Sequence, residues 1–307
     1  MRDDKKLLVV GGTGFIGKTL ALKASLIGYR VTILSSRNTH SVNRIPGIEY
    51  VIGDITDQRH LSSILKKRHF THVVNLAGYV NHSGYYKDGE KIISQHFDGV
   101  RNLVQCLNRD ALECFLQIGS SDEYGNNPSP QLEYTREMPI SPYSFGKVAS
   151  THLLQMLHLT EGFPSVVCRI FIVFGPFQGF NRLIPSVISA SLKNQSFPVS
   201  AGMQLRDFCY IDDVVDALLL ALDDKHAHGH VINIGSGTPR PVRDVVETIV
   251  RIVGKGTPRF GEIEYRKGEN MSLYADISKA KSLLNWSPKT DFVIGLSRTI
   301  DFYSGQH

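Results

Sequence analysis

Short apolar runs alternate with amphipathic stretches along the first half of the chain. Runs of this length are typical of strands buried on both faces of a parallel sheet, and the stretches between them have helical spacing. The alternation predicts an α/β fold with a parallel, doubly wound sheet. The expected strands cover Lys6–Val10, Arg30–Leu34, Glu49–Ile52, His72–Leu76, Cys114–Ile118 and Ser165–Phe171.

The second half of the chain, beyond Gly175-Pro176, has a less regular pattern. It contains more glycine and proline and shorter helical pieces, so a smaller C-terminal lobe at the edge of the sheet is expected. We assign residues 1–171 to the first domain and 172–307 mainly to the lobe, with parts near 206–235 returning to the core sheet. The expected helices of this half include Leu183–Leu192, Val214–Leu222 and Val242–Val253.

A glycine-rich turn joins the first expected strand to the first expected helix. In Gly11-Gly-Thr-Gly-Phe-Ile-Gly17, the first glycine permits a sharp turn, Gly14 allows close approach of a pyrophosphate, and Gly17 lets the helix press on the strand. The helix N-terminus then offers amide groups and partial positive charge to the phosphates. This order of strand, turn and helix predicts a dinucleotide site. Its expected contacts from the turn are Gly11, Thr13, Gly14, Phe15, Ile16 and Gly17.

The end of the second strand bears on which dinucleotide is bound. An acidic residue there would bind the ribose hydroxyls of NAD, but the chain reads Ser35-Ser36-Arg37. An arginine with two hydroxyls can hold a 2′-phosphate, which favours NADP and makes NAD the weaker expectation. Further cofactor contacts are expected where the third and fourth strands end. They are Asp54 and Ile55, then Leu76, Ala77 and Gly78.

Tyr143 and Lys147 stand four residues apart, so on a helix they project from one face. A neighbouring cation favours the phenolate, and Lys147 is therefore expected to lower the pKa of Tyr143. Tyr143 can then exchange a proton with a substrate oxygen, which Ser120 would hydrogen-bond and orient. The three residues predict proton transfer beside the dinucleotide.

The chain resembles the extended short-chain dehydrogenase/reductase family, in particular its nucleotide-sugar-modifying enzymes. The resemblance spans essentially the whole chain, and the order and spacing of its motifs make it specific. Besides the residues above, it rests on Gly53-Asp54-Ile55, Asn75-Leu-Ala-Gly78, Ser120-Ser-Asp-Glu-Tyr-Gly125, Arg169 through Gly175-Pro176, Arg206-Asp-Phe208 and Leu284-Asn-Trp286-Ser-Pro288.

This resemblance implies a Rossmann-type domain that binds NAD(P) and a C-terminal lobe that binds a nucleoside diphosphate sugar. It implies a catalytic set of Ser120, Tyr143 and Lys147, with Tyr143, Lys147 and Arg169 among the cofactor contacts. A homodimer is also implied, because helices near Tyr86–Asn108 and Tyr143–Thr160 commonly pack as a four-helix bundle in relatives. The same apolar positions fit an intramolecular core equally well.

The segment after Ser120 distinguishes the possible reactions. Ser121 and Asp122 fall where many sugar 4,6-dehydratases carry an Asp-Glu pair, and dehydration needs both an acid and a base. Since Ser121 is a hydroxyl, we expect a reductase that uses NADPH to reduce the C4 carbonyl of a nucleoside diphosphate 4-keto-6-deoxyhexose. A dehydratase or 4-epimerase that recycles its cofactor is the alternative, with Asp122 as a base. A dinucleotide sensor is disfavoured because it has no need of a proton donor.

Substrate phosphates must be bound by residues other than the asparagine used in many relatives, because Ile172 takes that position. Guanidinium groups bind phosphate through paired hydrogen bonds, so Arg206 and Arg266 are candidates, and Asn181 could help together with Arg182. Ser121 is also expected to touch the substrate.

Composition narrows the class of protein without changing these predictions. The chain has 307 residues, 42% hydrophobic and 21% charged, and no apolar run near the ~20 residues that cross a bilayer. The net charge of +5 includes no basic block interleaved with aromatics, so no nucleic-acid partner is expected. The N-terminal residues contain no signal-like apolar region, which favours the cytoplasm. The four cysteines lack metal-ligand spacing and are expected to be reduced thiols: Cys106, Cys114, Cys168 and Cys209.

Overall fold

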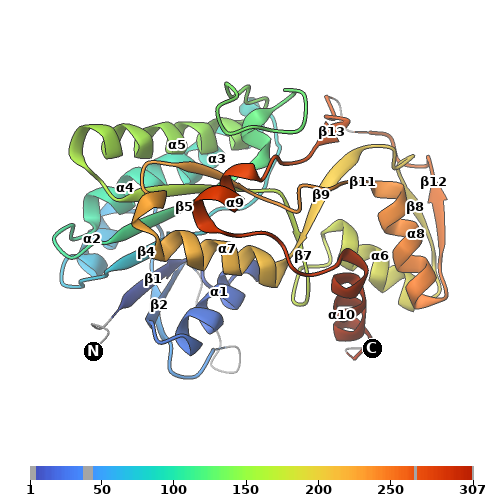
Figure 1. The fold of residues 1–307 in the computed structure, drawn as a ribbon, viewed down its shortest axis with the longest axis horizontal. Helices are drawn as coiled ribbons and strands as arrows, with labels where there is room; N and C mark the ends of the chain where they lie inside the picture. Colours follow the sequence, from blue (N-terminus) through green and yellow to red (C-terminus); the bar gives the residue numbers. More distant parts are fainter. Residues whose placement is uncertain (1–4, 37–43, 266–267, 306–307) are drawn as a thin grey trace.

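A computed structural model describes residues 5–36, 44–265 and 268–305 of the protein. Its centre is a seven-stranded sheet in the order β10-β6-β5-β4-β1-β2-β3, with every pair of neighbours parallel (Figure 1). The six strands expected from the apolar runs are all present, and a seventh comes from the second half of the chain. The strands are β1 (Lys6–Val10), β2 (Arg30–Ser35), β3 (Glu49–Ile52), β4 (His72–Asn75), β5 (Cys114–Ser120), β6 (Ser165–Ile170) and β10 (Val231–Ile234).

Helices cover both faces of this sheet, which confirms the doubly wound architecture (Figure 1). Successive residues of a strand face opposite sides. Leu7 and Val9 accordingly pack in the core that α1 and α7 cover, and Leu8 and Val10 in the core under the other helices. One layer contains α1 (Phe15–Leu26) and α7 (Ile211–Asp223); the other contains α2 (Gln58–Leu65), α4 (Gly99–Cys106) and α5 (Pro142–Glu161).

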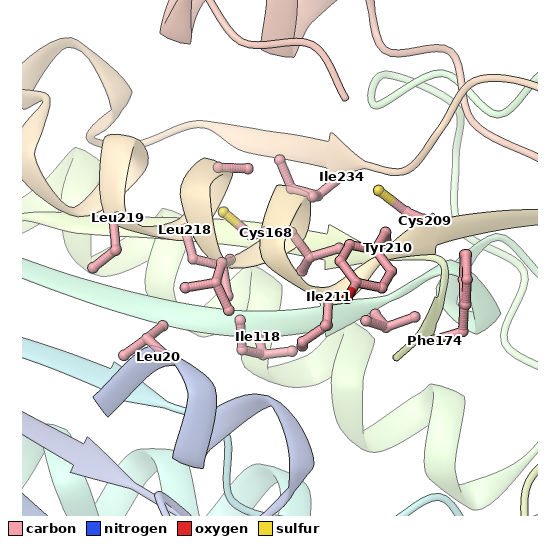
Figure 2. Close-up of a cluster of buried hydrophobic side chains, with 14 of the residues drawn as sticks. Leu20, Ile118, Cys168, Phe174, Cys209, Tyr210, Ile211, Leu218, Leu219 and Ile234 are labelled. Atoms are coloured by element: carbon pink, nitrogen blue, oxygen red, sulfur yellow. The ribbon is translucent and has the colours of Figure 1, made fainter. Parts of the chain in front are cut away.

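Figure 2 shows the core on the side of α1 and α7, where side chains from both halves of the chain meet. Leu218 of α7 lies near Cys168 of β6 and Ile118 of β5, and Leu20 of α1 lies close by. Cys114, Cys168 and Cys209 are buried, Cys106 is partly exposed, and all four are free thiols.

A continuous helical stretch precedes α4 and packs against α5. It consists of η2 (Tyr85–Gly89), α3 (Glu90–Ile93), η3 (Ser94–Asp98) and then α4, and η2 and η3 are π-helical. Short π-helical segments inside helices are frequent at functional sites. Here η3 brings His96 against α5.

The C-terminal lobe contains two small sheets and three helices, at the right of Figure 1. The sequence predicted that parts near residues 206–235 return to the core sheet. Residues 205–210 instead form a strand of this lobe, and the chain returns to the core sheet only with α7 and β10. The boundary near residue 171 stays a prediction. The lobe comprises β7 (Ile172–Phe174), β8 (Ser196–Val199), β9 (Leu205–Tyr210), β11 (Pro239–Pro241), β12 (Thr257–Phe260), β13 (Ser272–Leu273), α6 (Leu183–Leu192), α8 (Val242–Val253) and α10 (Phe292–Ser304).

Three short helices complete the described residues. They are η4 (Ser121–Tyr124) after β5, η5 (Lys225–Ala227) after α7, and α9 (Ser278–Leu284), which packs against β10. Among the helices of the described residues, none has the length and apolar content needed to cross a membrane.

Candidate active site

The glycine turn and the segment after β4 lie against each other at the carboxyl edge of the sheet. Gly11 has a φ of +76°, and a Cβ added there would lie 3.0 Å from the backbone nitrogen of Ala77. A left-handed backbone and this close approach both require glycine. The structure therefore brings the predicted cofactor contacts of β1 and β4 together, at the edge where α/β folds bind ligands.

Gly14 and Gly17 have different roles in the same turn. A Cβ on Gly17 would lie 2.6 Å from the carbonyl oxygen of Gly11, so helix α1 can approach the turn only with glycine there. A Cβ on Gly14 would meet only that same oxygen, at an ordinary 3.4 Å, and its φ of −77° suits any residue. The fold therefore does not require glycine at position 14. Close approach of a ligand would explain why this residue has no side chain.

Replacing Gly14 with alanine is expected to weaken dinucleotide binding by about 1–3 kcal/mol, because a methyl group would occupy the space of the pyrophosphate. The free energy of unfolding should stay within about 1 kcal/mol of the wild type, since the backbone there is compatible with alanine. Calorimetric titration with NAD and urea unfolding measure the two quantities. Gly17→Ala is the contrasting variant and should lower stability; equal NAD affinity in Gly14→Ala and wild type would contradict the assignment.

The remaining predicted cofactor residues lie around the ends of β2 and β3. Ser35 places its Oγ 3.2 Å from Oγ1 of Thr13, while Ser36 is exposed and Arg37 lies outside the described residues. Asp54 Oδ1 accepts hydrogen bonds from the backbone and hydroxyl of Thr56. The side chain of Ile55 is buried in the core beside α4, and Phe15 and Ile16 begin α1.

The three predicted catalytic residues meet where β5 ends and α5 begins. Ser141 caps α5 and Pro142 opens it, so Tyr143 occupies its first turn with Lys147 one turn later. The Ser120 side chain hydrogen-bonds to Tyr143, and Nζ of Lys147 donates to the carbonyl oxygen of Ile118 at 2.8 Å. All three side chains are less than a tenth exposed.

The pKa of Tyr143 is raised above its ordinary value, so the expectation that Lys147 lowers it is wrong for the protein alone. Burial is the largest cause, and the carboxylate of Asp122 raises it further, whereas the hydrogen bond from Ser120 and the charge of Arg182 act in the opposite direction. Lys147 lies 5.9 Å from the centre of the phenol ring. A cationic nicotinamide beside the phenol would supply the missing positive charge.

Burial lowers the pKa of Lys147 from 10.5 to about 8, although the nearby Glu123 carboxylate raises it in part. The ammonium still favours the phenolate of Tyr143, although burial outweighs it, so kcat/KM should fall as pH rises through about 8 and the lysine becomes neutral. The pH profile of kcat/KM tests this. The Lys147→Arg variant keeps its positive charge in this pH range, so whatever activity it retains should not decline near pH 8. If the activity of the wild type declined only near the ordinary lysine pKa, the lowered pKa of Lys147 would be contradicted.

Two histidines flank the phenol of Tyr143, and the sequence analysis assigned neither. The ring of His96 lies 4.9 Å from that of Tyr143 and the ring of His82 lies 5.7 Å away, both edge-on. His82 Nε2 is 3.6 Å from a carboxylate oxygen of Asp122. His82 follows the Leu76–Gly78 segment. Its position in the sequence, shortly after a strand that ends at the carboxyl edge of the sheet, could have indicated a site residue.

Glu123 and Arg169 form a buried ion pair behind Ser120. The Arg169 Nε donates to Glu123 Oε2 at 2.9 Å, and its guanidinium also pairs with Glu137, with its own side chain fully buried. Glu123 in turn accepts from the backbone nitrogen of Ser120 at 2.8 Å. The prediction that the Arg169 side chain contacts the cofactor does not fit this arrangement, because the guanidinium is enclosed by carboxylates and by the ring of Tyr124.

The predicted substrate residues come from both parts of the chain. Ser121 is buried in η4 and Asn181 is exposed just before α6. Arg206 on β9 forms an ion pair with Glu269, and Arg266 lies outside the described residues. Arg182 is the N-cap residue of α6, and its positive charge lowers the pKa of Tyr143 against the effect of burial.

Comparison with known proteins identifies this arrangement. Residues 7–235 match the family described as the NAD dependent epimerase/dehydratase family. The chain belongs to this family. It is 29% identical over 325 residues to the dTDP-glucose 4,6-dehydratase of Xanthomonas campestris pv. campestris strain B100, across 96% of this chain and 92% of that protein.

Further relatives show the same membership. A crystal structure of UDP-glucuronic acid 4-epimerase from Bacillus cereus, in complex with UDP-glucuronic acid and NAD, matches with a TM-score of 0.87 and 28% identity, across 98% of this chain and all of that one. A trifunctional Arabidopsis thaliana protein, named as a UDP-glucose 4,6-dehydratase, 3,5-epimerase and UDP-4-keto-L-rhamnose reductase, is 25% identical across 98% of this chain but only 47% of its own length.

These relatives confirm a nucleotide-sugar enzyme of oxidoreductase type, but they do not support two finer predictions. The family is NAD dependent and the solved relative carries NAD, so the preference for NADP is not supported and NAD is favoured. The reductase is not specifically supported either, because the two relatives that match over nearly the full length of both chains are named as a dehydratase and an epimerase. The alternative with a recycled cofactor is the better fit.

Proposed function

We propose that the protein is an NAD-dependent 4,6-dehydratase acting on a nucleoside diphosphate hexose. The observation that supports this most is the carboxylate of Asp122, which acts on the pKa of Tyr143 and faces His82 beside the phenol. An oxidation and reduction at C4 require only one proton carrier. Dehydration requires further groups that exchange protons at C5 and C6, and Asp122 provides one.

Bound NAD would accept a hydride from C4 of the sugar and later return it to C6. The chain's own residues handle the protons. Tyr143 takes the proton of the C4 hydroxyl, and Ser120 hydrogen-bonds the same oxygen and fixes its position. Once C4 is a carbonyl, the C5 proton becomes acidic, and Asp122 can take it. Burial of Ser120 and Tyr143 excludes water from the oxygen while it reacts.

Substrate phosphates would be held from the lobe of residues 172–307. We infer that Arg182 contributes, because its charge reaches the phenol from the start of α6. Arg206 and Arg266 stay candidates, with Arg206 held by Glu269 at the edge of the small sheet.

The test is incubation with NAD and dTDP-glucose or UDP-glucose, followed by mass spectrometry and NMR of the sugar. Loss of one water with formation of a 4-keto-6-deoxy sugar supports the dehydratase. An epimer of unchanged mass would support a 4-epimerase. For that reaction Tyr143 suffices as the proton carrier, and no carboxylic acid is needed at the position of Ser121. Stoichiometric consumption of NADH or NADPH with a 4-keto-6-deoxy sugar would restore the reductase.

We also infer a homodimer formed through α5 and the stretch before α4. Three large apolar side chains of α5 are exposed, each by 46% or more: Phe145, Met156 and Leu159, the last at 83%. Tyr85 and Tyr86 are exposed on η2, which packs against α5. Patches of this kind mark interaction sites.

Replacing Leu159 with lysine is expected to shift the protein from dimer to monomer, because a charge would be placed in the apolar contact. Light scattering coupled to size-exclusion chromatography measures the mass. Leu26 is the matched control, since it is 78% exposed on α1, away from α5. A wild type that runs as a monomer, or a dimer that Leu159→Lys leaves unchanged, would contradict this interface.

A further inference from the structure

The candidate site contains a base for dehydration but no carboxylic acid at the position next to Ser120. Removal of the C6 hydroxyl requires protonation of its oxygen, since hydroxide is a poor leaving group. Ser121 carries only a hydroxyl. Glu123 is fully buried and held by Arg169, Thr151 and the backbone of Ser120.

Resting on the dehydratase function, we propose that His82 is the acid that protonates the departing C6 oxygen. His82 and Asp122 follow β4 and β5, which are parallel neighbours, so both lie at the carboxyl edge of the sheet. The imidazole Nε2 lies 3.6 Å from the carboxylate, and its ring packs on the phenol of Tyr143. His82 thus lies beside both the carboxylate of Asp122 and the phenol of Tyr143. The atoms on which the three groups would act, C4, C5 and C6 of a hexose, lie within two bonds of one another.

The environment of His82 suits an acid that must be recharged after each turnover. Its side chain is 37% exposed, so it is open to exchange with solvent, and its Nε2 faces the carboxylate of Asp122. His96, the other histidine beside Tyr143, is unsuitable. Burial lowers the pKa of His96 to about 3, so it is neutral near pH 7 and has no proton to spare from its bond to the carbonyl of Tyr79.

The step balances in atoms and electrons. Asp122 takes the C5 proton, the electron pair of that C–H bond forms the C5=C6 double bond, and the C6–O bond breaks with its electrons leaving on oxygen. His82 gives its proton to that oxygen, and water departs. The hydride taken from C4 then adds to C6, Asp122 returns its proton to C5, and His82 is reprotonated as Tyr143 releases the proton of the C4 hydroxyl.

The decisive experiment compares wild type, His82→Gln and His60→Gln with NAD and a nucleotide-linked glucose in D2O. We expect His82→Gln to lose water elimination by about 10²- to 10⁴-fold. It should still accumulate reduced cofactor and exchange the C5 hydrogen for deuterium, because Tyr143 and Asp122 are intact. His60 is exposed on α2 and serves as the matched histidine control, expected to match wild type.

A substrate with fluoride at C6 separates acid catalysis from a structural role. Fluoride is the conjugate base of a far stronger acid than water, so its departure needs less protonation, and His82→Gln should recover most of the wild-type rate. Elimination of water by His82→Gln at the wild-type rate, loss of C4 oxidation in that variant, or no recovery with fluoride would each overturn the proposal. If wild type itself releases no water from either sugar nucleotide, the dehydratase function fails first.

Discussion

Replacing Tyr143 with phenylalanine is expected to lower kcat by about 10²- to 10⁴-fold, because the variant removes the one atom that exchanges a proton with the C4 oxygen. The ring remains, so its packing on His82 and His96 is retained. Binding of NAD and of the nucleotide sugar should change little, since the phenol oxygen contributes one hydrogen bond to the site. The loss should therefore appear in kcat and far less in KM.

Single-turnover measurement of reduced cofactor tests this most directly, because C4 oxidation is the step in which Tyr143 acts. Thermal unfolding and NAD titration of the same variant serve as controls for folding and binding. Appearance of reduced cofactor at the wild-type rate in Tyr143→Phe would show that another group takes the C4 proton, and would remove Tyr143 from the catalytic set.

Replacing Glu123 with glutamine is expected to lower the free energy of unfolding by about 3–5 kcal/mol, because it leaves the Arg169 guanidinium without one of its buried countercharges. Both side chains are fully buried, so solvent does not screen the loss. Although burial alone lowers the pKa of Arg169, the neighbouring carboxylates and Tyr124 raise it overall, so the arginine stays charged and cannot relieve the loss by deprotonation.

Urea unfolding measures this effect, with Glu49→Gln as the matched control. Glu49 pairs with Arg68 at a similar 2.7 Å, but that pair is exposed, and its loss should cost about 0–1 kcal/mol. If Glu123→Gln lowered the free energy of unfolding no more than the control variant does, burial would not increase the contribution of the pair between Glu123 and Arg169 to stability. Replacing Glu123 and Arg169 together by apolar residues should recover much of the loss.

The Glu123→Gln variant should also change the pH dependence of activity. Glu123 raises the pKa of Lys147 against the effect of burial, so its neutralisation should move the decline of kcat/KM to below about pH 8. The buried ion pair thus connects the stability of the fold to the charge beside Tyr143.

Local patterns in the sequence determined the architecture and the outline of the site. Apolar runs predicted six strands of the central sheet, because strands buried on both faces need apolar residues throughout. The glycine turn and the pair of Tyr143 and Lys147 were equally local, since turn geometry and helical spacing act over a few residues. The preference for NADP is not supported by the relatives, and a single arginine after the second strand is weak evidence for a 2′-phosphate.

Contacts between distant segments were decided only by the tertiary structure. His82 and His96 come to Tyr143 from the loop after β4 and from a π-helical turn, and no spacing along the chain relates them to it. The raised pKa of Tyr143 has the same origin, because burial and the approach of Asp122 outweigh a neighbour one helical turn away. Sequence periodicity encodes which face of an element is apolar, whereas the electrostatics of a site depend on which faces meet and how much water they exclude.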